Sequence, residues 1–530
     1  MLITSVSSIL RKTVFHLQHR SNLIDNNVDS WMKLGNNSKN MLTDVVGTTT
    51  TALASSVSDV NENDGSSSII FSPRARAGIW MAIAMAIHFG GYEFARNSNL
   101  ALFTSPETGF VKPYAYPLAM ATVSPFSFLL LMGYHRELET NGPRIALRNT
   151  TLWSIIIIGL SAFLFQLLAK YPIYIMNNLP LSKVLIALTF LFQNSYAHLL
   201  YNQHWSFLSS ILSVESGTRW FASIAGLSSL ASAFSGTMVS ILAQRIGLYG
   251  LLGCTAFTLS ISLLCAERAY YISKVYNFDP GDEISKKQVE KSRKKEDAQS
   301  NLTGKVQKLF QRVPELKALF FEVISFQSMA TILNICFVSK LKSTITNDIE
   351  RAAWTGRFYG SINAVSAAFQ FIILPLFLNR IETKLLWKLL PLIPMISCFL
   401  MTMNTQASLM VFALAFASAK CLDYSVRGVL TEIVYVPLDF DSRYVGKEIN
   451  GFFGNRLGKS GMSVLLSAIT GVFPNPLGIL TKLSVVASLS WGSCSWWLSS
   501  LISKSKEAQS AVDRKEKEDD GGSNNDKKTK

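Results

Sequence analysis

The chain has 530 residues, of which 49% are hydrophobic and only 16% are charged, and its formal net charge is +15. Soluble domains contain about 25% charged residues, so this composition excludes an ordinary soluble protein. Long uncharged runs alternate with charged joints, which indicates a membrane protein with many spans. Much of the excess of Lys and Arg lies in loops and in the C-terminal tail, so we expect no nucleic acid as a partner.

Cysteine and histidine give no sign of a metal or redox site. The six Cys lie in apolar segments without a CxxC pair, and the six His are scattered without ligand spacing. No Ser/His/Asp grouping or HExxH helix is present in the sequence. We therefore expect a protein that is not an enzyme and that uses no metal or cofactor.

Residues 1–73 are rich in Ser, Thr and Asn and contain no apolar run long enough to span a membrane. As far as Arg20 the segment is basic and free of acidic residues, which is typical of an organellar targeting segment. Acidic residues further on weaken the pattern. The alternative interpretation is a disordered N-terminal tail.

Twelve apolar stretches follow in two groups of six. The sequence predicts spans at 77–97, 114–134, 151–169, 184–208, 219–243, 247–267, 317–338, 355–378, 385–403, 407–427, 452–471 and 478–502. We expect an all-α membrane protein with two pseudo-symmetric six-helix bundles, 74–267 and 317–502, a basic hydrophilic central loop, 268–316, and a charged disordered tail, 503–530. Lys and Arg in the short loops place both termini on one side, equivalent to the cytoplasm.

A short internal repeat links the fifth and eighth spans. The fifth opens with Arg219-Trp-Phe-Ala-Ser-Ile and the eighth with Arg357-Phe-Tyr-Gly-Ser-Ile, each followed by small residues. Small residues let membrane helices approach closely, as an interface between moving bundles requires. A chance likeness between two helices rich in small residues is the alternative.

Polar residues recur at membrane depth in the fourth and tenth spans. Asn194, His198 and Asn202 repeat every fourth residue, so they share one helix face, which we expect to meet a cavity or another helix. In the tenth span Lys420 and Asp423 are three residues apart, and Asp423 and Arg427 are four apart. This spacing allows pairing along one face and favours an internal cluster of salt bridges.

The stretch from Thr431 to Gly461 leaves one apolar span, exposes a polar turn and enters the next span with Arg456 and Lys459. A Lys at mid-depth costs about 2.5–3.5 kcal/mol, which suggests that it holds an anion. A Lys whose amine reaches the membrane surface is the simpler alternative. A Walker A phosphate loop is disfavoured, because Gly454 and Gly458 enclose three residues where that motif needs four.

The same stretch resembles the plastid and bacterial-parasite ATP/ADP translocase family. The similarity is carried by Glu432, Tyr435, Pro437-Leu438-Asp439, Gly446-Lys447 and Leu457-Gly458-Lys459-Ser460-Gly461, and more weakly by Tyr92, Arg96, 205–236 and 339–342. The resemblance implies a twelve-span carrier of the major-facilitator type in the lipid bilayer. It also implies exchange of adenine nucleotides (ATP/ADP antiport) by alternating access, across a plastid (chloroplast) or parasite envelope.

From the polar pattern together with this resemblance, we expect an anionic small-molecule substrate in a polar, mildly cationic cavity at the midplane. The residues expected to bind it are Lys459, Arg96, Tyr92, Gln193, Asn194, His198, Asn334 and Arg456. Cationic side chains suit phosphate oxygens, and neighbouring aromatic rings suit a nucleotide base.

The sequence departs from the family pattern at positions where the resemblance implies charges. Gln193 and Asn334 stand where the family has Glu, and Asn97 replaces an acidic residue after Arg96. Tyr116 is the nearest match to a lysine expected before the second span, with Lys112 as a shifted candidate. A related carrier for another organic anion or metabolite, or a non-transporting membrane scaffold, therefore remains an alternative.

Overall fold

The computed structural model describes residues 72–175, 179–211, 214–278, 309–374, 381–403, 407–435, 449–473 and 476–523. Three predicted features lie wholly or largely outside these ranges: the targeting segment in 1–71, the centre of the hydrophilic loop at 279–308, and the polar turn at 436–448.

The first half of the described chain is built from four long helical elements: α3 (Pro73–Thr104), α4 (Ala115–Lys170), α5 (Leu181–Ile211) and α6 (Val214–Val275). Between α4 and α5, β1 (Tyr174–Ile175) pairs antiparallel with β2 (Leu179–Pro180). Both α4 and α6 contain a sharp break, at Gly142 and Gly247, where φ is 79° and 71°. Glycine adopts positive φ without a steric penalty, so each of these two elements supplies two consecutive spans.

The second half is more interrupted. Its elements are α9 (Pro314–Thr344), α10 (Asp348–Ala368), η4 (Phe369–Ile373), α12 (Thr383–Leu389), α13 (Leu392–Met403), α14 (Leu409–Leu422), η5 (Asp423–Arg427), α15 (Gly428–Tyr435), η6 (Ile449–Gly454), η7 (Leu457–Gly461), α17 (Met462–Val472) and α18 (Leu477–Ser523). The four η segments are π-helical turns within longer helices. Such turns are rare and are found frequently at functional sites.

Each of the twelve predicted spans coincides with a helical segment of the described chain. Eight segments among the described residues are long and apolar enough to cross a membrane, and one of them, Ser223–Val275, covers two predicted spans. The first, eighth and eleventh spans fall short of that criterion, because they carry more polar and small residues or are shorter. The count of about twelve spans rests on these segments together.

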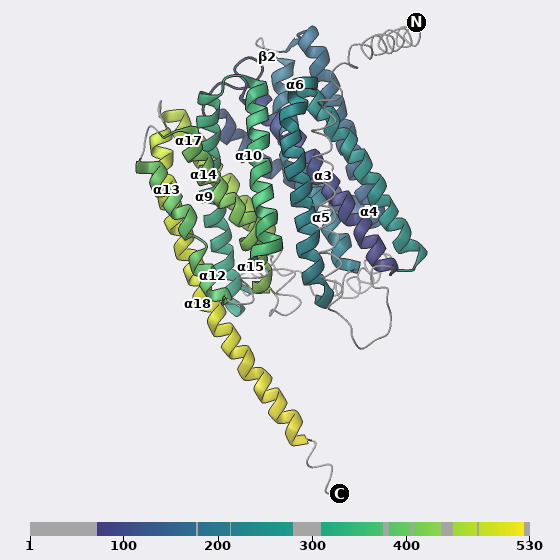
Figure 1. Ribbon diagram of the computed structural model, residues 1–530, viewed down its shortest axis with the longest axis vertical. Helices are drawn as coiled ribbons and strands as arrows, with labels where there is room; N and C mark the ends of the chain where they lie inside the picture. Colours follow the sequence, from purple (N-terminus) through teal and green to yellow (C-terminus); the bar gives the residue numbers. More distant parts are fainter. Residues whose placement is uncertain are drawn as a thin grey trace, which may run out of the picture. The chain divides into compact units, whose positions relative to one another are not determined.

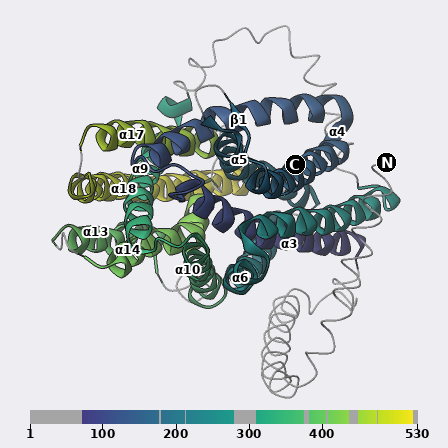
Figure 2. The same cartoon turned by 90° about the horizontal axis from the view of Figure 1, so that it is seen from above.

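Two hydrophobic clusters define two helix bundles. One cluster is formed by residues of α3 to α6, and the other by residues of α9 to α18; Leu100 and Ala352 are the members that come from the opposite half. Figures 1 and 2 show the elements of the first half beside those of the second. The bundles meet where α10 packs against α6 and α3, and where α17 packs against α4.

Glycines bring α6 and α10 unusually close together. A Cβ atom on Gly356 would lie 2.7 Å from the carbonyl oxygen of Gly236, and one on Gly236 would lie 2.9 Å from the Cα atom of Gly360. Such distances are shorter than real Cβ contacts, so only glycine fits. These helices contain the fifth and eighth spans, whose small residues were expected to permit close approach between helices, and the structure shows that the two spans pack against each other.

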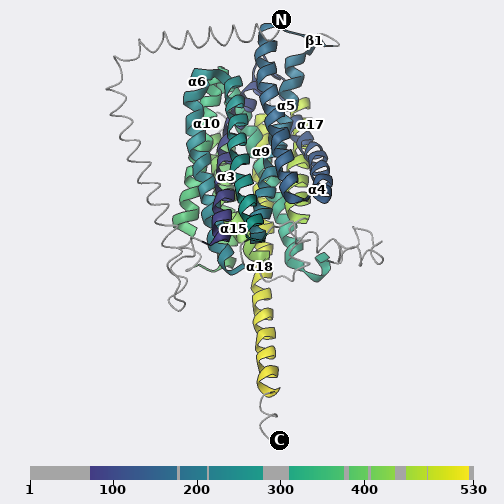
Figure 3. The same ribbon diagram turned by 90° about the vertical axis from the view of Figure 1, so that its right-hand side faces the viewer.

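The last helix, α18, extends beyond the predicted end of the twelfth span to Ser523 (Figure 3). We expected a disordered tail from 503 onward. The segment after Ile502 is rich in Lys and Glu, which have high helix propensity, and this composition favours the continued helix.

Candidate functional site

Lys459 lies in η7, at the boundary between the two bundles. Gly458 allows this turn to pack tightly on α9, because a Cβ there would lie 2.7 Å from the carbonyl oxygen of Ile324. The neighbouring Ser460 donates a hydrogen bond to Ser124 of α4, in the other bundle. Lys459 is half-buried, and within the described ranges no hydrogen bond or ion pair engages its amine.

Other charged side chains gather around Lys459. Arg456, one turn earlier, and Lys420 of α14 are both close enough to repel its charge, and Asp423 of η5 is close enough to attract it. His198 of α5 lies within electrostatic range of all three cations, although it belongs to the first bundle. The cluster therefore brings charged and titratable side chains of both bundles together at their boundary.

A chain of ion pairs connects this cluster to the core of the second bundle. Lys420 Nζ lies 3.3 Å from Asp423 Oδ2, and Arg427 Nη1 lies 3.1 Å from Asp423 Oδ1. Arg427 also donates two hydrogen bonds to Glu322 of α9, at 2.9 and 2.8 Å. Trp491 of α18 donates a further hydrogen bond, 2.8 Å long, to Glu322. The predicted pairing of Lys420, Asp423 and Arg427 is confirmed.

Within the described ranges, the ion pairs and close charges around Lys459 involve four cations and two carboxylates, namely Lys420, Arg427, Arg456, Lys459, Glu322 and Asp423. Two of these cations therefore lack a carboxylate partner within the set. Uncompensated positive charge in a membrane is costly, and an anion bound beside it offsets that cost.

A second cluster forms where α3 meets α10. Arg96 makes an ion pair with Glu93 one turn before it, and its guanidinium lies 3.4 Å from the centre of the Tyr359 ring in the other bundle. Asn363 of α10 donates a hydrogen bond of 3.1 Å to the buried Glu93 carboxylate. Arg96 therefore already has a counter-ion. Asn97, where the family resemblance implies an acid, donates to Glu93 instead of carrying charge.

Gln193 and Asn194 lie beside this second cluster. Gln193 is buried next to Tyr92, whose ring is 5.6 Å from the Arg96 guanidinium. Asn194 donates hydrogen bonds to the carbonyl oxygen of Phe190 and to the Gln193 side chain. The Nε2 atom of Gln193 is buried without a partner among the described residues. Both side chains thus belong to the packed interior of the first bundle.

Asn334 of α9 donates a hydrogen bond of 2.9 Å to the hydroxyl group of Tyr116 in α4. These are two of the positions at which the family resemblance implies opposite charges. Here a neutral hydrogen bond joins the bundles in place of a charged pair. Tyr116 also lies near Arg96 and Tyr92, so Asn334 reaches the second cluster through it.

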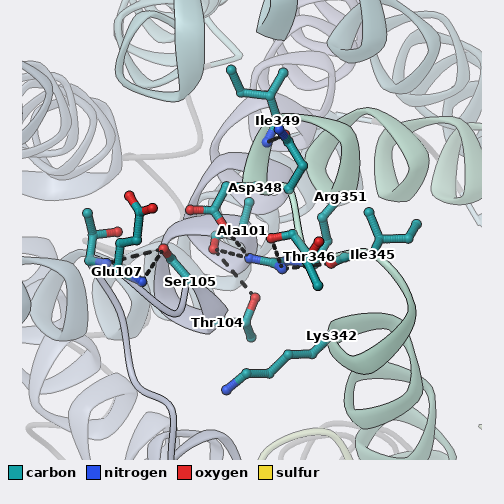
Figure 4. A network of polar contacts seen from close by, with 12 residues as sticks. Ala101, Thr104, Ser105, Glu107, Lys342, Ile345, Thr346, Asp348, Ile349 and Arg351 are labelled. Carbon is teal, nitrogen blue, oxygen red and sulfur yellow. Dashed lines mark hydrogen bonds and ion pairs between the residues drawn. The ribbon is translucent and has the colours of Figure 1, made fainter.

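The bundles are also tied together at the end where α3 and α9 finish. Lys342 donates to the carbonyl oxygens of Phe110 and Val111, both at 3.0 Å. Arg351 donates to the carbonyl oxygen of Ala101 at 3.2 Å and also pairs with Asp348 (Figure 4). Side chains of the second bundle thus bind backbone of the first and hold this end closed.

The structure divides the eight predicted binding residues into two groups. Three of them meet at the cationic cluster: His198, Arg456 and Lys459. The others lie in or near the cluster around Arg96: Tyr92, Arg96, Gln193, Asn194 and Asn334. Glu93 and Tyr359 were missed as its partners. Tyr359 belongs to the recurring Arg-aromatic-aromatic segment, and this was the one available signal.

The comparisons agree with the family resemblance. Residues 391–507 match the model of a family described as TLC ATP/ADP transporter. This region includes Lys420, Asp423, Arg427, Arg456 and Lys459. No curated protein matches this chain significantly.

Solved transporter structures share the fold. A bacterial homologue of the iron transporter ferroportin in an inward-facing state is 12% identical, with a TM-score of 0.53, and the match covers 80% of this chain and 99% of that one. The nucleoside transporter NupG is 11% identical, with a TM-score of 0.52 and the same two coverages. At such identities the likeness concerns the fold alone. The chain thus has the major-facilitator-like fold of these transporters, and its residues 391–507 match the TLC ATP/ADP transporter family.

Proposed function

We propose that this protein exchanges ATP and ADP across its membrane by alternating access, with no covalent chemistry. The observation that carries the proposal is the amine of Lys459, which has no ion-pair partner among the described residues and lies between the bundles beside Arg456 and Lys420. It belongs to the part of the chain that matches an ATP/ADP transporter family.

The chemistry of the cluster fits a nucleotide. Lys and Arg bind phosphate oxygens through short, charge-assisted hydrogen bonds, and two positive charges here lack carboxylate partners among the described residues. Tyr424 is 37% exposed and supplies an aromatic surface beside the cations. The Tyr424 ring lies 5.0 Å from the Lys420 amine, so base and phosphate contacts would be adjacent.

Exchange of radiolabelled ADP into proteoliposomes loaded with ATP tests the proposal. The unaltered protein should exchange the nucleotides, and Lys459→Ala should lose about tenfold or more in rate, since it removes a charge-assisted contact worth about 1.5–3 kcal/mol. Lys388→Gln is the matched control, because that lysine is exposed at a helix end away from the cluster. No exchange by the unaltered protein, or full exchange by Lys459→Ala, would contradict the proposal.

A carrier for another organic anion is the second candidate, and the neutral Tyr116–Asn334 bond favours it. The resemblance implies charges at both positions, and their replacement removes ionic groups that would serve nucleotide exchange. Thermal unfolding with a panel of nucleotides and organic anions discriminates the two, because a ligand of the folded state raises Tm. A shift with a carboxylate anion and none with ATP or ADP would favour the second candidate.

We also propose that the membrane is a plastid-type envelope. The basic, acid-free start of the chain as far as Arg20 supports an organellar targeting role for 1–73. A fluorescent protein fused behind residues 1–73 should accumulate in plastids of a plant cell. Diffuse cytosolic fluorescence would count against this location.

A further inference from the structure

The two ion pairs of Asp423 differ in how firmly they are held. The pair with Arg427 is part of a buried set, because Arg427 is 8% exposed and its other partner, Glu322, is fully buried. The pair with Lys420 is longer, at 3.3 Å, and its members are 19% and 14% exposed. Arg427 is thus held by two carboxylates, Glu322 and Asp423. Within the described residues Lys420 forms an ion pair with Asp423 alone, and this pair is more exposed.

Lys420 also takes part in the cationic cluster. Its charge acts on both Lys459 and His198, which lie on η7 and on α5 of the other bundle. Its amine lies 5.0 Å from the exposed ring of Tyr424. A lysine has a flexible stem and three rotatable donors, so it can change partner with little movement of the helix. The fork of Arg427, in contrast, is fully engaged by Glu322 and Asp423.

We propose that Lys420 is a third anion-holding cation of the site and that Asp423 is its counter-ion while the site is empty. On binding, a phosphate group of the ligand takes the Lys420 amine from Asp423, which keeps its hydrogen bond to Arg427. Asp423 is therefore a positioning residue that competes with the ligand. This inference rests on the proposed function and specifies the ligand class of the same site.

The ligand class follows from the number of cations that become available. Among the described residues no carboxylate pairs with Lys459 or Arg456, and release of Lys420 adds a third cation from a different helix. Three cations on α14 and the eleventh span suit two or more linked phosphate groups. We expect nucleoside di- and triphosphates to bind, and monophosphates and uncharged nucleosides to bind much more weakly.

Two substitutions with opposite expected effects test the inference in the ADP/ATP exchange assay. Lys420→Gln should raise the KM for ADP about tenfold, because it removes a charge-assisted contact to phosphate. Asp423→Asn should lower this KM by about two- to fivefold, because a partly exposed ion pair that competes with the ligand is worth about 0.2–1 kcal/mol. Asparagine at 423 can still accept the hydrogen bond from Arg427. The buried ion pair between Arg427 and Glu322 should therefore stay in place.

A purely structural salt bridge gives a different pattern. Loss of either partner would then reduce the amount of folded protein or the maximal rate, with KM unchanged in both variants. That pattern would overturn the inference while leaving nucleotide exchange intact. Lys388→Gln again serves as the control and should keep both KM and the maximal rate.

A binding measurement separates failure of this inference from failure of the proposed function. Inorganic tripolyphosphate should raise the Tm of the purified protein, more in Asp423→Asn and less in Lys420→Gln. If this order holds although nucleotides are not exchanged, the inference stands and the proposed function fails. Equal shifts in all three proteins, or none, would overturn the inference. Should Lys420→Gln not fold, a Tm shift in Asp423→Asn no larger than in the parent decides against it.

Discussion

Glu322 accepts three hydrogen bonds, two from Arg427 and one from Trp491, and it has no exposed surface. A buried carboxylate is tolerated only when its charge and its lone pairs are satisfied. Glu322 meets that requirement through Arg427 of η5 and Trp491 of α18. The same contacts fix Arg427, and through it Asp423 at the edge of the cationic cluster.

Glu322→Gln should therefore destabilise the folded protein by about 3 kcal/mol or more, because it leaves a buried guanidinium short of a counter-charge. Thermal unfolding of the purified protein measures the effect. Glu267→Gln is the matched control, since its pair with Arg144 is 26% and 37% exposed and such pairs contribute about 0–1 kcal/mol. Equal Tm values for the two variants would show that the Glu322 contacts do not hold the bundle.

The sequence predicts pairs within one helix better than pairs between helices. Spacings of three and four residues were enough for Lys420, Asp423 and Arg427, because helix geometry alone brings them together. Nothing local indicates that Glu322 is their fourth member, 105 residues away along the chain. Arg96 was expected to bind substrate, and its pairing with Glu93 was missed even though the two lie one turn apart.

Among the elements, the crossing of α6 and α10 is the closest described contact between the bundles. Gly236, Gly356 and Gly360 place backbone against backbone there, and Tyr359 next to them stacks beneath Arg96 of α3. Close, smooth surfaces allow two helices to shift against each other without long side chains interlocking. This geometry suits the relative motion that alternating access requires.

Gly356→Ala should impair exchange and lower Tm, because its Cβ would lie 2.7 Å from both the Gly236 carbonyl oxygen and the Val239 Cβ atom. Overpacking of this kind costs about 1–3 kcal/mol. Gly253→Ala is the control, since no atom lies within 4 Å of its added Cβ. The exchange rate and Tm are measured for both variants. If Gly356→Ala exchanges nucleotides as fast as the unaltered protein, close packing of α6 and α10 is not needed for exchange.

Element positions were predictable because apolar length marks a span. Small residues indicated that the fifth and eighth spans could approach other helices closely, but not that they pack against each other. The π-helical turns were not predictable, because no residue pattern distinguishes them from α-helix. Yet η5 and η7 carry Asp423, Arg427 and Lys459. A π-helical turn contains one residue more than an α-helical turn, so it changes which side chains share a helix face. The residues that make up the cationic cluster could therefore not be predicted from the 3.6-residue period of an α-helix.

At the scale of the whole molecule, the two bundles meet at sites of contrasting chemistry. At one end, Lys342 and Arg351 bind backbone carbonyl oxygens of the first bundle. Deeper, Tyr116 and Asn334 join the bundles without charge. The cationic cluster around Lys459 also lies at the boundary. The proposed exchange requires the contacts of Lys342 and Arg351 to break while this cluster stays available to the substrate.

The two-bundle arrangement agrees with the expectation from the sequence. That all eight residues bind one substrate in a midplane cavity stays a prediction. Arg96 is paired with Glu93, whereas no described carboxylate pairs with Lys459, and Tyr424 lies within electrostatic range of both Arg96 and Lys420. Only packing between the halves brings these groups together, and composition and periodicity contain no information on that packing.

The proposed exchange places the substrate at the boundary beside Lys459. Alkylation of His198→Cys by a membrane-impermeant anionic thiol reagent, with and without ADP, tests this placement. The parent chain corrects for the six native cysteines, and Lys170→Cys, at an exposed helix end, controls for effects of ADP on the reagent.

We predict that the reagent modifies His198→Cys and that ADP at about ten times its Kd slows this reaction about tenfold. Modification of Lys170→Cys should not change. A thiol at 198 that never reacts, or that reacts equally fast with saturating ADP, would contradict the account.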